Sequence, residues 1–169
     1  MIPLDVVTKF DRLLSERGMA FEAVVIGGAA LNILGVISRE TQDVDVLEPL
    51  IDPKILQASK DFASKTGIGV TSLKENLLNH GPESLRKYLR KDWRARLQPL
   101  FQGAAITFTT LGRVDLIGTK LLAYCDRGRD LNDCLDLKPT KEEILEILPW
   151  VQGYDGKLKM AAICSGSIK

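Results

Sequence analysis

The spacing of apolar and polar residues changes along the chain, and each spacing predicts one kind of element. Apolar side chains at helical spacing predict an amphipathic helix from Leu4 to Arg17, which Gly18 ends. An apolar run that begins at Phe21 then predicts a buried strand, and this run stops at the glycine pair Gly27-Gly28. The first part of the chain is therefore predicted as helix, strand and glycine turn.

The residues after the glycine pair continue into a second strand. A short helical pattern runs from about Gly28 to Leu34 and ends at Gly35. Asp43 and Asp45 then alternate with two valines, and alternation of polar and apolar residues predicts a strand with one polar face. The stretch from Phe21 to Leu47 is thus predicted as strand, glycine turn, helix and strand.

The rest of the chain adds elements that fit an α/β (α+β) arrangement. We expect one domain over residues 1–169, with a sheet core over about 1–111, C-terminal helices over about 112–153 and a loosely held tail from 154. The predicted elements are a helix from Pro53 to about Lys65, a polar loop from Gly67 to Pro82, strands at Arg96–Phe101 and Ala104–Thr110 joined by a Gln102-Gly103 turn, and helices from Arg113 to Arg127, from Asp130 to Leu137 and from the capping box of Thr140 and Glu143 to Pro149, which closes or kinks the helix.

Asp43 and Asp45 are the candidate metal ligands of this arrangement. In a strand their alpha carbons would lie about 6.6–6.8 Å apart on one face, so the two carboxylates can converge on one divalent cation. Carboxylate oxygens are the ligands that Mg²⁺ prefers, and one or two from the protein suffice where water and substrate phosphate supply the rest. The alternative is a solvated strand end without a function.

Gly27 and Gly28 suit the other half of such a site. Without beta carbons they let a phosphate approach the backbone closely, and the N–H groups at the start of the following helix would point at it. The alternative is a plain turn, because short motifs often occur by chance. Arg39, just ahead of the aspartates, either stays near the phosphates or pairs with Glu40.

Two blocks of the sequence resemble a known family. The residues Gly27-Gly28-Ala29-Ala30-Leu31, followed by Arg39-Glu40-Thr41-Gln42-Asp43-Val44-Asp45, resemble the nucleotidyltransferase fold of the polymerase beta superfamily. Within that superfamily they resemble the AbiEii-type toxins and related small bacterial nucleotidyltransferase-like proteins. The block Lys120-Leu121-Leu122-Ala123-Tyr124-Cys125-Asp126-Arg127, with Asp130-Leu131-Asn132-Asp133, resembles the third and fourth motifs of that group. Order and spacing agree, and the motifs together span most of the chain.

The resemblance implies a small mixed sheet flanked by helices, with C-terminal helices over a nucleotide cleft. It implies transfer of a nucleotidyl group from an NTP to a hydroxyl, with Mg²⁺ or Mn²⁺ as cofactor and an RNA acceptor such as a tRNA end. It also implies a toxin of a toxin–antitoxin or defence system, with a cognate antitoxin as partner. The implied site residues are Asp43 and Asp45 as metal ligands, Gly27, Gly28, Arg39, Lys120 and Arg127 at the nucleotide phosphates, and Asp130 or Asp133 as base or as the group that orients Lys120.

The predicted strand Ala104–Thr110 departs from the superfamily. Many of its enzymes carry a third carboxylate on a later strand, and this run has no acid. Either Asp130 or Asp133 supplies the acid or the site is reduced, and Asp130 is equally explained as a helix N-cap. The alternative function is a noncatalytic nucleotide-binding or protein-interaction module that keeps the fold. A further alternative is transfer onto a small molecule or a protein.

Composition and charge restrict the partners. The chain has 169 residues, 45% hydrophobic and 27% charged, as in an ordinary globular protein. A net charge of +1 excludes an affinity for nucleic acid that depends on a global positive field, so RNA contact needs a local patch.

Glu83–Arg96 is the most basic stretch and contains Tyr88 and Trp93. It is either a surface for single-stranded RNA or a solvated helix face whose aromatic side chains pack in the core, which we favour for the aromatics.

The sequence also gives expectations about compartment and cysteine chemistry. No apolar run approaches the roughly 20 residues of a membrane span, and the N-terminal residues lack the apolar region of a signal peptide. We therefore expect a cytoplasmic protein without a membrane partner. Cys125, Cys134 and Cys164 are an odd number without metal-ligand spacing, which argues against a disulfide framework and a zinc site. His80, the only histidine, lies in the predicted polar loop, where an incidental role is commoner than a catalytic one.

Overall fold

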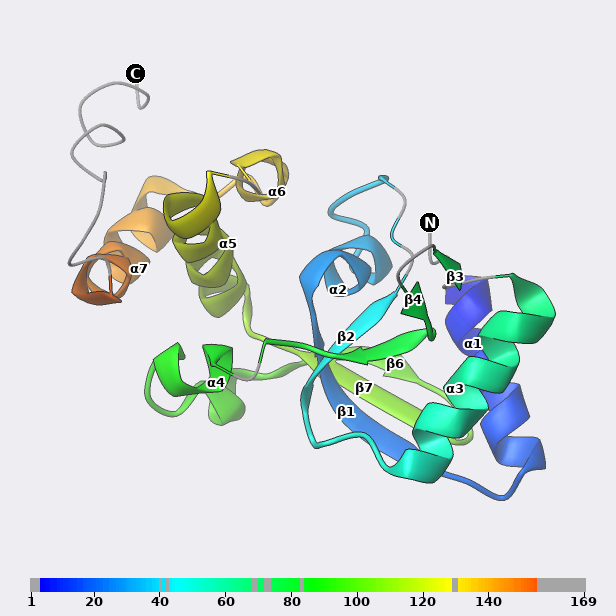
Figure 1. The fold of residues 1–169 in the computed structure, drawn as a ribbon. Coiled ribbons are helices and arrows are strands. Elements are labelled where there is room, and N and C mark those ends of the chain that lie inside the picture. Colours follow the sequence, from blue (N-terminus) through cyan, green and yellow to red (C-terminus); the bar gives the residue numbers. More distant parts are fainter. Residues whose placement is uncertain are drawn as a thin grey trace. The chain divides into compact units, whose positions relative to one another are not determined.

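The computed structural model describes residues 4–154, except residues 40, 42, 68, 69, 72, 73, 83, 129 and 130. The chain forms two compact units (Figure 1). The sheet unit comprises the described residues up to Lys87 together with Arg96–Leu111. The helical unit comprises Tyr88–Ala95 and the described residues from Gly112 on. The predicted tail lies, after Tyr154, outside the described residues.

The sheet unit contains a five-stranded mixed sheet in the order β5-β2-β1-β7-β6. β1 runs parallel to β7 and antiparallel to β2, β2 runs parallel to β5, and β6 and β7 form an antiparallel hairpin. The mixed sheet and its helices confirm the predicted α/β class. The elements up to Leu111 are α1 (Leu4–Glu16), β1 (Phe21–Ile26), α2 (Gly27–Ile33), β2 (Val44–Glu48), α3 (Pro53–Thr66), β3 (Val70–Thr71), β4 (Lys74–Glu75), β5 (Leu78–His80), α4 (Leu85–Tyr88), the 3₁₀ helix η1 (Trp93–Arg96), β6 (Gln98–Gln102) and β7 (Ile106–Thr110).

One face of the sheet is buried under α1 and α3, which lie side by side (Figure 1). Phe10 of α1 and Phe62 of α3 pack edge to face, with ring centroids 5.3 Å apart. The strands contribute side chains from alternate positions, as the two-residue period of a strand requires. The positions between them, which include Asp45, Asn79 and Thr109, belong to the opposite face. The core positions of the strands are Phe21, Ala23 and Val25 on β1, Val44 and Val46 on β2, Leu78 on β5, and Ile106 and Phe108 on β7.

The prediction of a polar loop from Gly67 to Pro82 is wrong, because this stretch contains three strands. β5 forms an edge of the main sheet, and β3 and β4 form a separate two-stranded sheet. Leu78, the first residue of β5, is fully buried, and its N–H donates to Ser59 Oγ at 2.8 Å. β5 has three residues, the last two of them polar, so its local pattern lacks the signal of a strand. Its pairing with β2, far earlier in the chain, decides its structure.

The other predicted elements of the sheet unit are present with small shifts. α1 ends at Glu16, and Gly18 takes a left-handed φ of 63° after it. α3 begins with Asp52 as its N-cap, whose Oδ1 accepts a hydrogen bond from Lys54 N at 2.7 Å. β6 begins at Gln98 rather than at the predicted Arg96, because the preceding residues form η1.

The helical unit contains α5 (Arg113–Arg127), α6 (Leu131–Asp136) and α7 (Lys141–Tyr154). The predicted capping box of α7 is confirmed, since Glu143 N donates to Thr140 Oγ1 at 3.2 Å and Thr140 N donates to Glu143 Oε2 at 2.9 Å. Pro149 lies inside α7 and does not close it. Arg113 joins two helices, because it binds Glu143 Oε1 at 2.6 Å and the carbonyl oxygen of Leu137 at 2.8 Å. None of the helices in the described part of the chain is long and apolar enough to cross a membrane.

A buried carboxylate holds the start of β7. Asp11 on α1 accepts hydrogen bonds from the backbone N–H groups of Ala104, Ala105 and Ile106 at 3.1, 2.9 and 2.7 Å. A beta carbon on Gly103 would overlap this carboxylate, so the turn before β7 requires glycine. Burial alone would raise the pKa of Asp11, but the three backbone donors outweigh it and hold the pKa below its usual value.

Replacing Asp11 should therefore destabilise the sheet unit in a pH-dependent way. Asp11→Asn exchanges a charged acceptor for an amide, which should cost about 2 kcal/mol of unfolding free energy at neutral pH. The pKa of Asp11 is lowered on folding, so its contribution is present above the unfolded value of 3.8 and is lost as the pH falls through the folded value. The difference between variant and wild type, followed by thermal unfolding with circular dichroism, should shrink below about pH 4.

Asp5→Asn is the matched control for this experiment. Asp5 lies on the same helix, is exposed, and pairs with exposed Lys9 at 3.5 Å. This control should change the melting temperature little at any pH. Equal melting temperatures of Asp11→Asn and wild type at neutral pH would contradict the role of Asp11.

Candidate functional site

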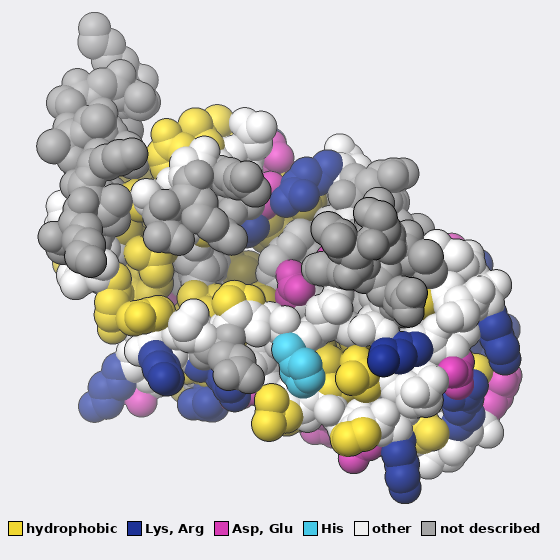
Figure 2. Space-filling view, viewed as in Figure 1, with side chains coloured by type: hydrophobic (Ala, Val, Ile, Leu, Met, Phe, Trp, Pro, Cys, Tyr) yellow, Lys and Arg dark blue, Asp and Glu magenta, His cyan; other side chains and the backbone are white. Residues whose placement is uncertain are grey.

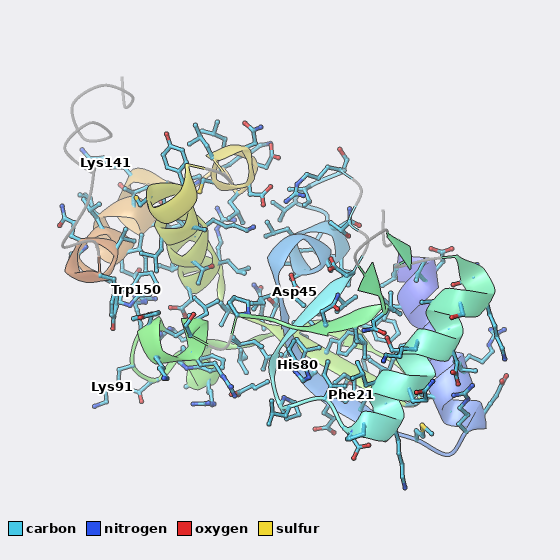
Figure 3. The ribbon with its side chains drawn as sticks, viewed as in Figure 1. Phe21, Asp45, His80, Lys91, Lys141 and Trp150 are labelled. Carbon is cyan, nitrogen blue, oxygen red and sulfur yellow. The ribbon has the colours of Figure 1, made fainter. Side chains whose placement is uncertain are left out.

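Asp45 lies within β2, and Asp43 immediately precedes this strand. Asp45 is opposite Ile26 of β1 and opposite Asn79 of β5, so it occupies the middle of three neighbouring strands (Figure 3). Val44 and Val46 point into the core, which leaves Asp45 on the face opposite α1 and α3. Both aspartates are half-buried.

Asn79 connects the two aspartates. Its position opposite Asp45 in the parallel pair puts its side chain on the same face of the sheet. Its Nδ2 donates a hydrogen bond to Asp43 Oδ2 at 2.9 Å, which brings Asp43 to this face as well. The sequence analysis assigned no role to Asn79, because it placed the residue in a loop. The only signal was its place next to two buried leucines.

The glycine turn lies against Asp45. Gly27 follows Ile26 directly and has a left-handed φ of 76°, a conformation that other residues adopt only with strain. A beta carbon on Gly27 would lie 3.0 Å from Asp45 Oδ2. The first turn of α2 and the carboxylate of Asp45 are therefore close neighbours in the sheet unit.

Gly28 is covered by the segment that leads from α2 to β2. A beta carbon there would lie 2.7 Å from the methyl group of Thr41 and 3.6 Å from Arg39 Nη2. Asn32 Nδ2 holds this segment by donating to the carbonyl oxygens of Ile37 and Arg39, each at 3.2 Å. The guanidinium group of Arg39 thus lies beside the glycine turn. The alternative pairing with Glu40 concerns a residue outside the described part of the chain.

The donor set suits a hard divalent cation better than zinc. Its groups are carboxylate and amide oxygens, which Mg²⁺ and Mn²⁺ prefer. No group of three or more His, Cys, Asp or Glu side chains that could hold a metal ion occurs among the described residues. Thr41 Oγ1 is buried and has no hydrogen-bond partner within the described residues. The methyl group of the same side chain lies against Gly28.

β7 brings no carboxylate to this face, where it presents Thr107 and Thr109. A bulge in the pairing of β1 with β2 places Glu48 opposite Val24, which returns Glu48 to the face of Asp45. Glu48 is half-buried. The sequence analysis missed it, because the bulge changes the alternation that the pattern of β2 predicts.

His80 lies on β5 and not in the predicted loop. It is opposite Val46 in the register of β5 with β2, so it does not share the face of the aspartates. Its side chain is exposed and is visible at the surface (Figure 2).

In the helical unit, Lys120 and Asp133 form an ion pair. Lys120 Nζ lies 2.7 Å from Asp133 Oδ2, and their side chains are 12% and 3% exposed. The pair connects α5 with α6. Of the other residues predicted in this block, Asp130 lies outside the described residues, as does the side chain of Arg127.

The basic segment before β6 is not a uniform solvated face. Arg90 is mostly buried, with Nε 2.8 Å from Asp115 Oδ1 and Nη1 2.8 Å from Glu146 Oε1. Asp115 is buried and Arg90 pairs with it, so the guanidinium group of Arg90 stabilises this carboxylate inside the helical unit. Trp93 is buried, as predicted for the aromatic residues. Tyr88 is exposed, and the prediction of a core position is wrong for it.

The ion pair of Lys120 and Asp133 should stabilise the helical unit. Lys120→Met removes the cation beside the buried carboxylate of Asp133, and Asp133→Leu removes the carboxylate beside the ammonium group of Lys120. Each should lower the unfolding free energy by about 3–5 kcal/mol, whereas the double variant should recover most of the loss. Chemical denaturation followed by circular dichroism measures all three. Lys141→Met, at the exposed start of α7, is the control, and single variants as stable as this control would rule out a structural role of the pair.

A comparison with known proteins assigns the family. Residues 4–148 match the model of a family described as nucleotidyltransferase of unknown function (DUF6036). No curated protein and no solved structure gives a match. The family match covers most of the chain, including the glycine turn, both aspartates, Asn79, Lys120 and Asp133. The chain therefore belongs to the DUF6036 family of nucleotidyltransferases.

Proposed function

We propose that this protein transfers a nucleotidyl group from an NTP to a hydroxyl group in a reaction that depends on a divalent cation. The hydroxyl oxygen would bond to the α-phosphorus, the hydroxyl would lose its proton, and pyrophosphate would leave. The observation that carries the proposal is the contact between the glycine turn and Asp45, with Asp43 on the same face of the sheet. A phosphate at Gly27 would lie next to the carboxylates that attract its counterion. Membership of a nucleotidyltransferase family supports the reaction class.

Asp43 and Asp45 would hold Mg²⁺ or Mn²⁺. Two carboxylates are the usual protein contribution for Mg²⁺ where substrate phosphates supply further ligands. The bound ion would neutralise charge on the phosphates and activate the acceptor hydroxyl. The half-burial of both aspartates leaves them accessible to a ligand at this face of the sheet.

Gly27, Gly28 and Arg39 would bind the triphosphate. Glycines carry no beta carbons, which is the property that lets a phosphate approach backbone N–H groups closely. The guanidinium group of Arg39 beside Gly28 can form charge-assisted hydrogen bonds to phosphate oxygens. This arrangement supports the phosphate role of Arg39 that the sequence left open.

The resemblance assigns roles in nucleotide binding and transfer to Lys120, Arg127, Asp130 and Asp133 of the helical unit. Lys120 and Arg127 would stabilise negative charge on the nucleotide during transfer. The contact of Asp133 with Lys120 supports an orienting role for Asp133, which leaves Asp130 as the candidate base.

For the acceptor we propose RNA, such as a tRNA end, within a toxin–antitoxin setting with a cognate antitoxin, as the AbiEii-type resemblance implies. Lys87, Lys91 and Arg94 are exposed and are candidate RNA contacts. Lys and Arg side chains gather at the surface around α4 (Figure 2). A protein or a small molecule is the alternative acceptor.

A noncatalytic nucleotide-binding or protein-interaction module is the second candidate function. The observation that favours it is the lack of an acid on β7, where Thr107 and Thr109 occupy the face of the aspartates. Such a module would bind NTP with a divalent cation and transfer nothing.

A transfer assay tests the proposal. Purified protein is incubated with Mg²⁺ and each α-labelled NTP in turn, with total RNA, and the label is followed into RNA, protein and small molecules. Wild type should label one acceptor class. Asp43→Asn and Asp45→Asn should each lower the rate by about 100-fold or more, because each removes a charged ligand of the cation.

Asp52→Asn is the control, since asparagine also caps helices well and Asp52 lies outside the site. It should transfer at the wild-type rate. NTP binding without transfer to any acceptor would support the noncatalytic module, and transfer that survives both aspartate substitutions would overturn the proposed site.

A further inference from the structure

β5 holds Asn79 in a fixed place at the edge of the sheet. Leu78 N, just before it, donates to the buried Ser59 Oγ at 2.8 Å. Gly81 N, just after β5, donates to the carbonyl oxygen of Val46 at 2.8 Å. Val44 N donates to the carbonyl oxygen of Leu77 at 2.8 Å, which ties the start of β2 to this segment. The backbone around Asn79 is therefore fixed relative to β2.

The position of the Asp43 carboxylate depends on a side-chain hydrogen bond as well as on the backbone. Asp43 precedes Val44, the first residue of β2, and lies outside the strand ladder. The hydrogen bond from Asn79 Nδ2 to Asp43 Oδ2 at 2.9 Å connects this carboxylate to the fixed edge strand. Because one oxygen is held, the direction of the other oxygen of the same carboxylate is set as well.

An amide is a neutral hydrogen-bond donor, so it can hold Asp43 without changing the charge of the site. A lysine at position 79 would neutralise the carboxylate of Asp43 and compete with a cation. An aspartate at position 79 would repel the carboxylate of Asp43. The asparagine donates a hydrogen bond and adds no charge to the site. Groups that orient metal ligands in this way typically contribute 10- to 100-fold to metal affinity.

We propose that Asn79 is a positioning residue that orients Asp43 toward the divalent cation. The inference rests on the proposed function, because it needs a cation at Asp43 and Asp45. Asn79 touches neither nucleotide nor acceptor in this account. It acts through Asp43, and its place on a short edge strand explains why a strand is needed at this point of the chain.

The test is a titration of the protein with Mn²⁺, followed through the spin signal of the free ion. Asn79→Ala should raise the dissociation constant about 10- to 100-fold and leave the melting temperature within a few degrees of wild type. Asn76→Ala is the matched control, since this half-buried asparagine lies just before β5 and outside the contact with Asp43. Its dissociation constant should equal that of wild type.

The double variant Asp43→Asn with Asn79→Ala separates positioning from direct coordination. If Asn79 acts only through Asp43, its removal should not raise the dissociation constant for Mn²⁺ further once Asp43 has been replaced. A further rise in the double variant would mean that residue 79 is itself a ligand. That result, or an unchanged dissociation constant for Asn79→Ala, would overturn the inference.

Two further comparisons distinguish failure of the inference from failure of the proposed function. If wild type binds no Mn²⁺, or if Asp45→Asn binds it as well as wild type does, the proposed cation site itself is wrong. If Asp45→Asn loses Mn²⁺ and Asn79→Ala keeps it, only the role of Asn79 fails.

In the transfer assay, Asn79→Ala should need more Mg²⁺ for half-maximal rate and should reach the wild-type maximal rate. A general loss of structure would lower the maximal rate instead.

Discussion

The pairing of β2 between β1 and β5 is the constraint on which the candidate site depends. One neighbour, β1, leads directly into the glycine turn, so the register of Ile26 with Asp45 brings Gly27 against the carboxylate. The other neighbour, β5, carries Asn79 opposite Asp45 and within hydrogen-bonding distance of Asp43. A shift of β2 by one residue would turn Asp45 into the core and Val46 out of it, so burial of the valines fixes the place of the carboxylates.

The sequence predicted those elements whose pattern is local. The sequence signals of three helices, and of the capping box of a fourth, lie within one or two helical turns; these are α1, α3, α5 and α7. The Gln102-Gly103 turn likewise predicts the hairpin of β6 and β7. β5 was missed, because its three residues become a strand only through β2. The hydrogen bonds that Asp11 accepts from Ala105 and Ile106 could not be predicted from the sequence pattern either, since they join residues more than ninety positions apart.

The residues of the candidate site also fall into those that a local motif predicts and those that depend on strand pairing. Gly27, Gly28, Asp43 and Asp45 could be named from the sequence, because each motif lies within a few residues and each has a recognised chemistry. Asn79 and Glu48 could not, since one needs the register of β5 and the other needs a bulge in β2. The pairing of Arg90 with Asp115 reverses the expectation for a basic segment, because a buried carboxylate binds an arginine that the pattern assigned to solvent.

The most direct test of this account is the position of a bound metal ion and nucleotide. Crystals grown with Mn²⁺ and a non-hydrolysable analogue of the NTP that binds, measured at the manganese absorption edge, would locate both. The account predicts an anomalous peak coordinated by Asp43 and Asp45, with the phosphates at the Gly27-Gly28 turn beside Arg39. A peak away from both aspartates, or a triphosphate bound elsewhere than at the turn, would contradict it.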